Sequence, residues 1–262
     1  MNRAERRRQA REDRERIARG LEAGRADGRE VIALMRVLYD LIAEARDAGT
    51  VAPVMNFFHA NMRAAERLAP SERLACRRGC AHCCHAFVSA RAPEVLFIKS
   101  AIPGRDREDV RAAVADAYAV TGMLLPGERG ATAHPCPMLR DGACGIYAAR
   151  PLTCRMAVSE SAEICARAFA PGAGPMHIPL PEYYPTLRRG YSVALGGALR
   201  RAGFPACSYE YNSAMRAALA RPDAEAAWLA GEDVFADVLQ DPGSDPFVLP
   251  SNLRLYDDAF AD

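Results

Sequence analysis

Apolar residues recur every three or four positions after residue 30, which is the spacing of an amphipathic helix. This pattern predicts a helix that ends near Gly49. A second helix is expected to follow Pro53, with an apolar face of its own. Both faces are expected to lie in the hydrophobic core. They consist of Val31, Leu34, Met35, Leu38, Leu41, Ile42 and Ala45 in the first helix, and Val54, Phe58, Met62 and Ala65 in the second.

Further helices are predicted from the same periodicity and from the residues that interrupt it. Pro93 is expected to open a short helix that Gly104 breaks, and Asp106 to cap the next helix. Residues 122–135 are expected to form a loop, because glycine and proline punctuate them. Helical patterns then cover residues 189–202, 210–220 and 223–239, and a turn-rich tail that is expected to be irregular runs from 240 to 262.

One short hairpin is predicted near residues 138–147. Asp141-Gly142 lies between short apolar runs, and both central positions of a two-residue hairpin turn require positive φ. The hairpin would bring Cys136 and Cys144 close together. The fold class expected from these patterns is mainly α and loop-rich, with a small irregular cysteine-cluster metal domain.

Changes in pattern along the chain suggest four regions. The first is dense in arginine and acidic residues, and a solvated arm explains it better than a nucleic-acid-binding arm. The regions are a charged N-terminal arm at 1–28, a helical N-terminal region at 29–70, a cysteine-cluster metal-binding domain at 71–170 and a helical C-terminal region with an irregular tail at 171–262.

Composition narrows the range of partners and compartments. The chain has 262 residues, of which 50% are hydrophobic and 26% charged, and its net charge is +1. So small a charge argues against nucleic acid and anionic membranes as partners. No run reaches the roughly 18 apolar residues of a membrane span, and the first 20 residues lack the apolar core of a signal peptide. A cytoplasmic protein is therefore expected, and clustered cysteines in that reducing compartment indicate metal or redox chemistry.

Two cysteine groups carry the candidate chemistry. Metal sites draw soft ligands from separate chain segments, and two groups of thiols fit that requirement. Two alternatives remain open: a thiol–disulfide switch, and buried thiols that merely fill space. The second of these is the expectation for Cys207. The candidate ligands are Cys76, Cys80, Cys83 and Cys84 in the first group, and Cys136, Cys144, Cys154 and Cys165 in the second.

Adjacent thiols raise the number of metals that the site could hold. The side chains of Cys83 and Cys84 diverge in a helix or a strand, so both cannot easily complete one tetrahedral ion. Two ions, a bridging thiolate or a cluster of several metals would use both. Cys165 is either a further ligand or a core residue, and His82 and His85 either ligate metal or lie beside the ligands. Glu94 is the nearest carboxylate that could ligate.

Arginines flank the candidate ligands and would offset the surplus negative charge of several thiolates. Arg77 and Arg78 follow the first cysteine. Arg150 and Arg155 flank Cys154, and these two are the candidate cofactor-binding residues. The metal is expected to be iron, either as an ion or in an iron–sulfur cluster, or else zinc.

The sequence resembles a known family in these cysteine boxes. "CRRGCAHCC" followed by "CPMLRDGACGIYAARPLTCR" fills every position of a CxxxCxxCC box and a CPxLxxxxCxIYxxRPxxCR box. This is the pattern of a cysteine-cluster family described as zinc- or iron-chelating. The resemblance covers residues 76–156 and implies a metal-chelating domain. The two cysteine boxes also resemble those of flagellin lysine methylases.

The sequence thus favours a thiolate metal-binding protein whose partner is a metal ion, without naming a protein partner. The alternative is a metal-dependent redox or methyl-transfer enzyme that acts on a protein substrate. The sequence leaves open whether the protein is an enzyme. An empty polar pocket beside the cysteines would favour the enzyme.

Overall fold

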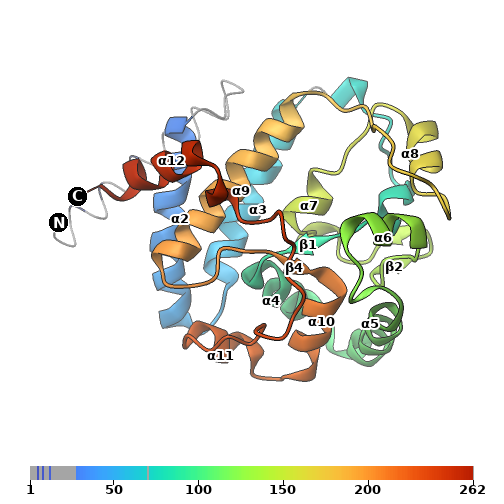
Figure 1. Cartoon of the computed structure of the whole chain (residues 1–262). Coiled ribbons are helices and arrows are strands. Elements are labelled where there is room, and N and C mark those ends of the chain that lie inside the picture. The colour runs from blue at the N-terminus through green and yellow to red at the C-terminus, as the bar shows by residue number, and fades with distance from the viewer. Residues whose placement is uncertain (1–4, 6–7, 9–11, 13–27, 70, 262) are drawn as a thin grey trace.

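The protein is mainly helical, as predicted from the sequence. The computed structural model describes residues 5, 8, 12, 28–69 and 71–261. The expected solvated arm at 1–28 lies almost wholly outside the described residues. Figure 1 shows helices on all sides of the molecule and only very short strands. None of the described helices is both long and apolar enough to cross a membrane.

Four helices form one side of the molecule (Figure 1). Helix α2 packs against α9 most extensively and also against α3 and α12. The apolar stripe predicted from Val31 to Ala45 is the buried face of α2. Gly49, where the helix was expected to stop, has φ +67 and turns the chain. The four helices are α2 (Gly28–Ala48), α3 (Ala52–Leu68), α9 (Tyr183–Arg201) and α12 (Pro250–Phe260).

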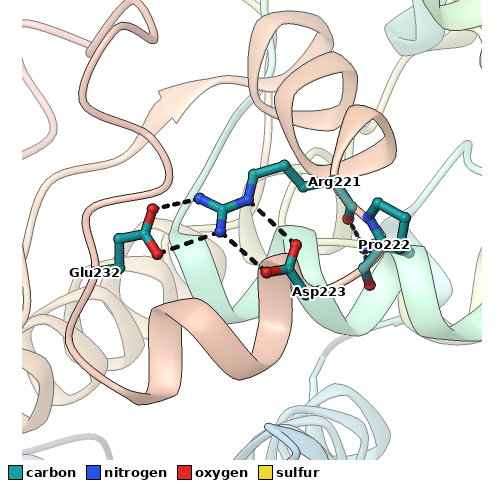
Figure 2. Close-up of polar contacts among 5 residues, drawn as sticks. Arg221, Pro222, Asp223 and Glu232 are labelled. Carbon is teal, nitrogen blue, oxygen red and sulfur yellow. Dashed lines mark hydrogen bonds and ion pairs between the residues drawn. The ribbon is translucent and has the colours of Figure 1, made fainter.

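A second group of helices packs around α10. Helix α10 contacts α4 and α5, and α11 follows it in the chain. Figure 2 shows the corner between α10 and α11, where Arg221 lies between the carboxylates of Asp223 and Glu232. The helices of this group are α4 (Ala92–Ala101), α5 (Arg107–Thr121), α10 (Tyr211–Ala220) and α11 (Ala224–Leu229).

Of the two antiparallel strand pairs in the described residues, one joins distant segments and the other forms a local hairpin. Strand β1 pairs with β4, with Ser89 opposite Glu210. Strand β2 pairs with β3, with Leu139 opposite Cys144, which confirms the predicted hairpin. The strands are β1 (Ser89–Ala90), β2 (Leu139–Arg140), β3 (Ala143–Cys144) and β4 (Tyr209–Glu210).

Short helices and turns make up the cysteine-rich part of the chain. Its α-helices are α6 (Pro126–Thr132), α7 (Leu152–Arg155) and α8 (Ala162–Ala168). Single 3₁₀ turns occur here and elsewhere, at η1 (Ser71–Arg73), η2 (His82–His85), η3 (Gly104–Asp106), η4 (Tyr147–Ala149) and η5 (Pro246–Val248).

Three predictions of local structure were wrong. Helix α6 lies inside the expected loop, because Pro126 suits a first helical turn and the Glu128 carboxylate accepts a hydrogen bond from the Leu125 N–H. The pattern at 223–239 gives only the short helix α11, since Gly231 at φ +98 leaves the helical region. The tail contains helix α12, which packs on α2.

Asp106 does precede α5, as expected, but its side chain makes no capping hydrogen bond.

One hydrophobic core connects the helices with the cysteine-rich part. It contains residues of α2, α3, α4, α9 and α10 together with Met138, Leu152 and Met156. The second box therefore rests on the same core as the long helices. The boundaries proposed after residues 70 and 170 remain predictions.

Candidate metal site

Six of the eight candidate cysteines line one cavity of about 560 Å³. They come from both boxes, so the fold brings together segments separated by more than 50 residues of chain. Much of the remaining wall is apolar, with Phe87, Val88 and Ile146 among the lining residues. The six are Cys80, Cys83, Cys84, Cys136, Cys144 and Cys154.

A backbone hydrogen bond joins the two boxes directly. The N–H of Cys136 donates to the carbonyl oxygen of Cys84 at 2.8 Å. The buried Arg129 of α6 reinforces this junction. Its guanidinium donates to the His85 carbonyl at 2.8 Å and to the His134 carbonyl, which flank the two joined cysteines.

Sequence reasoning missed Arg129, because it lies in the segment expected to be a loop. Pro126 followed by Glu128 is the signal that could have identified the start of α6.

The hairpin places Cys144 on the cavity wall. Asp141 and Gly142 have φ values of 49 and 73, the positive values predicted for both central turn positions. The Gly145 N–H donates to the Met138 carbonyl at 2.8 Å, so hydrogen bonding between the two arms of the hairpin continues beyond the turn. The turn thus returns the chain so that Cys144 and Cys136 border the same cavity.

Helix α7 carries Cys154 and is fixed by Glu94 of α4. One oxygen of the buried Glu94 carboxylate accepts the Leu152 N–H at 2.7 Å, and the other accepts the Arg91 N–H at 2.8 Å. Glu94 was the nearest carboxylate that could ligate metal, but it does not line the cysteine cavity. Its two oxygens cap the starts of α4 and α7.

Arg155 lies in a buried network behind the cavity wall. Its side chain is 3% exposed and pairs with Glu66 at 3.1 Å. It also donates to the Ala148 carbonyl at 3.0 Å, and its Nη2 lies 3.3 Å from the Nδ1 of buried His59. Arg155 is absent from the cavity lining. These contacts join α3, η4 and α7, and the cofactor-binding role expected for Arg155 stays a prediction.

Arg150, in contrast, lines the cavity. Its guanidinium stacks on the ring of Tyr147, 3.9 Å from the ring centroid, and its Nε is buried without a hydrogen-bond partner among the described residues. Its positive charge lowers the pKa of Cys83, Cys144 and Cys154, against larger effects in the opposite direction. Arg150 is therefore the arginine placed to offset negative charge on the thiols.

Burial disfavours the ionised form of two of these thiols. It raises the pKa of Cys136 to about 11 and that of Cys154 well above its usual value. A hydrogen bond with Cys84, followed by burial, raises the pKa of Cys83. A bound cation would reverse this balance, because the thiolate is the form that binds metal.

Cys76 and Cys165 lie beside the cavity and do not line it. Cys76 is exposed, and the thiols that act on its pKa are Cys80, Cys83 and Cys165. Cys165 is buried in α8, which packs against η2. Neither His82 nor His85 contributes to the lining.

Among the described side chains, no three of His, Cys, Asp or Glu converge closely enough to hold a metal ion. The assignment of the individual ligands therefore stays a prediction. The donor set itself fits zinc or iron, since all six side chains are thiols.

Part of the chain matches a known protein family. Residues 75–168 match the family model CxxCxxCC, described as "Putative zinc- or iron-chelating domain". The matched segment includes both boxes and Cys165. No curated protein and no solved structure matches the chain.

We expect Arg129→Gln to loosen the junction between the boxes, because glutamine cannot reach both the His85 and His134 carbonyls. Cys84 and Cys136 should then react several-fold faster with iodoacetamide, as measured by peptide mass spectrometry of the metal-free protein. Arg140→Gln is the matched control, since Arg140 is an arginine that bonds only to nearby carbonyls of its own hairpin region. Equal rates at both cysteines in the two variants would contradict the role of Arg129.

The buried His59 should make stability depend on pH. Burial, followed by the charge of Arg155, lowers its pKa to about 3, whereas an unfolded histidine has a pKa of about 6.5. Between these values the unfolded chain binds a proton that the folded chain does not. The contribution of the neutral, buried His59 to stability is therefore complete above pH 6.5 and is lost as the pH falls.

Between pH 7 and pH 5 the free energy of unfolding should fall by about 2 kcal/mol more in the native sequence than in His59→Phe. Urea unfolding at the two pH values measures this difference. Replacing the exposed His177 with glutamine should leave the native dependence unchanged. An identical loss in the native sequence and in His59→Phe would contradict the effect.

Proposed function

We propose, on the premise that residues 75–168 form a zinc- or iron-chelating cysteine-cluster domain, that this protein binds iron in the cytoplasm as an iron–sulfur centre. The observation that carries the proposal is the single cavity lined by six thiols from both boxes. Thiolates are the usual protein ligands of iron–sulfur clusters. The cavity thus offers the right donors from two segments that the fold already joins.

The number and placement of the thiols favour iron over zinc. A structural zinc ion takes four ligands in a closed tetrahedron, whereas six thiols border this cavity. Cys83 and Cys84 are adjacent in η2, and both reach the cavity wall. A cavity of about 560 Å³ is also far larger than one ion requires, and a cluster of several metals would use more of it.

The surrounding residues support a negatively charged centre. Cluster thiolates and sulfides carry surplus negative charge, which a nearby cation offsets. Arg150 lies on the cavity wall and already acts on three of the thiols. We assign to Arg150 the role of holding this charge, and to Cys80, Cys83, Cys84, Cys136, Cys144 and Cys154 the role of ligands. Cys76 and Cys165 would be ligands at the edge of the site.

Metal content tests the proposal directly. Protein purified without oxygen should contain iron and acid-labile sulfide, and it should absorb near 400 nm. Exposure to air should bleach this absorption as the cluster oxidises. Stoichiometric zinc without iron or visible absorption would overturn the iron assignment and leave zinc chelation. Anaerobic protein with neither metal would overturn metal binding altogether.

Loss of one ligand should also expose the domain to protease. A structural thiolate site contributes on the order of 10 kcal/mol to folding, so metal binding and folding of residues 75–168 should be coupled. We expect Cys144→Ser to lose metal and to be cleaved within this segment. Cys207→Ser is the control, because Cys207 is partly buried, lies outside the cavity and packs on the core. Equal metal content and equal cleavage patterns in the two variants would contradict the coupling.

One observation favours the second candidate, a redox or methyl-transfer enzyme that acts on a protein. A cleft of about 610 Å³, whose lining includes several charged and polar side chains, lies beside the cysteine cavity, and Thr153 of α7 borders both. Arg188, Arg189 and Ser192 of α9 line this cleft. A substrate bound there would lie against Thr153, which directly precedes Cys154 in the chain.

If the protein is such an enzyme, adenosylmethionine or a reductant should change the visible spectrum of the iron-loaded protein. Iron-loaded protein whose spectrum responds to neither would count against the enzyme and leave iron binding in place.

A further inference from the structure

Tyr211 borders the cysteine cavity, although it lies outside residues 75–168. It begins α10 and directly follows β4. Its N–H donates to the Val88 carbonyl at 2.9 Å, next to the pairing of β1 with β4. Val88 follows the first cysteine box closely in the chain. The strand pair therefore fixes Tyr211 beside the segment that follows the first box.

The hydroxyl group of Tyr211 lacks a partner. The residue is 3% exposed, and its buried hydroxyl oxygen has no hydrogen-bond partner among the described residues. Leaving such a group unsatisfied costs about 1–3 kcal/mol, so native structures rarely do so without a reason. The Nε of Arg150, on the same cavity, is another buried donor without a hydrogen-bond partner among the described residues. Both donors thus border the six thiols.

Among the charged groups, thiols have the largest electrostatic effect on the Tyr211 hydroxyl. After burial, the charges of Cys136, Cys154 and Cys144 raise the Tyr211 pKa most. The hydroxyl therefore stays protonated at neutral pH and can only donate to a negative neighbour. A neutral thiol is a weak acceptor, whereas a thiolate accepts a strong, charge-assisted hydrogen bond. Loss of the thiol protons on metal binding would supply the missing acceptor.

We propose that Tyr211 is a positioning residue of the metal site, whose hydroxyl donates a hydrogen bond to a metal-bound thiolate of Cys136, Cys144 or Cys154. This inference rests on the proposed metal-binding function and extends the site beyond the matched family segment. Hydrogen bonds to ligand sulfurs stabilise bound metal and raise the reduction potential of an iron–sulfur centre. Tyr211 thereby couples α10 to the chemistry of the cysteine cavity.

The test replaces Tyr211 with phenylalanine, which keeps the ring and removes only the hydroxyl. Tyr209→Phe is the matched control, because Tyr209 is equally buried, lies two residues away and has its hydroxyl beside Cys207, outside the cavity. Anaerobic Tyr211→Phe should contain as much metal as the native protein. It should transfer that metal to a competing chelator about five- to tenfold faster, as expected for the loss of one hydrogen bond.

Spectroscopy separates positioning from a merely structural role. The thiolate-to-iron absorption bands of Tyr211→Phe should shift and its reduction potential should fall, whereas Tyr209→Phe should match the native protein in both. Native release rate, spectrum and potential in Tyr211→Phe would overturn the inference, and so would a change confined to the unfolding midpoint. A native protein without metal would instead overturn the proposed function, so the two failures are distinguishable.

Discussion

The hydrogen bond from the Cys136 N–H to the Cys84 carbonyl is the contact on which the site depends. It holds together two boxes that lie far apart in the chain, and a gathered set of thiols exists only while they are joined. Arg129 strengthens the junction from a buried position, where its guanidinium donates to the His85 and His134 carbonyls. These contacts thus help to close the cavity.

Long-range contacts from the helical core hold the other walls in place. Glu94 fixes the start of α7, and Arg155 connects that helix to Glu66 and His59 of α3. The carboxylates of Glu94 and Glu66 belong to α4 and α3, which lie outside the second box. Ligands supported in this way keep their positions with little loss of entropy on binding. Through these contacts and its apolar residues, the second box shares a core with the long helices.

The sequence predicted the parts of the fold that local chemistry determines. Periodicity identified α2 and α3, because each buries one continuous apolar stripe. The Asp141-Gly142 turn identified the hairpin, since few other residue pairs adopt positive φ twice. Spacing of the cysteines identified the two boxes, and six of their thiols line one cavity. Their role as metal ligands stays a prediction.

Features that depend on tertiary contacts could not be predicted in this way. Arg155 follows Cys154, but neighbours in a helix point about 100° apart, so adjacency did not show that its side chain faces α3. Helix α12 has a turn-rich approach and gains its stability from packing on α2. Nothing local distinguishes Tyr211 from other aromatic residues, because its place beside the cavity depends on the pairing of β1 with β4.

X-ray absorption spectroscopy of anaerobically purified protein tests the central claim most directly, that thiols of both boxes bind one iron centre. The account predicts an iron edge with a first shell of sulfur at about 2.3 Å, the usual length of a metal–thiolate bond, and iron–iron scattering beyond it. Cys144→Ser and Cys83→Ser should each alter this shell, although they lie in different boxes. A first shell of oxygen and nitrogen, or a sulfur shell that responds to substitutions in only one box, would contradict the account.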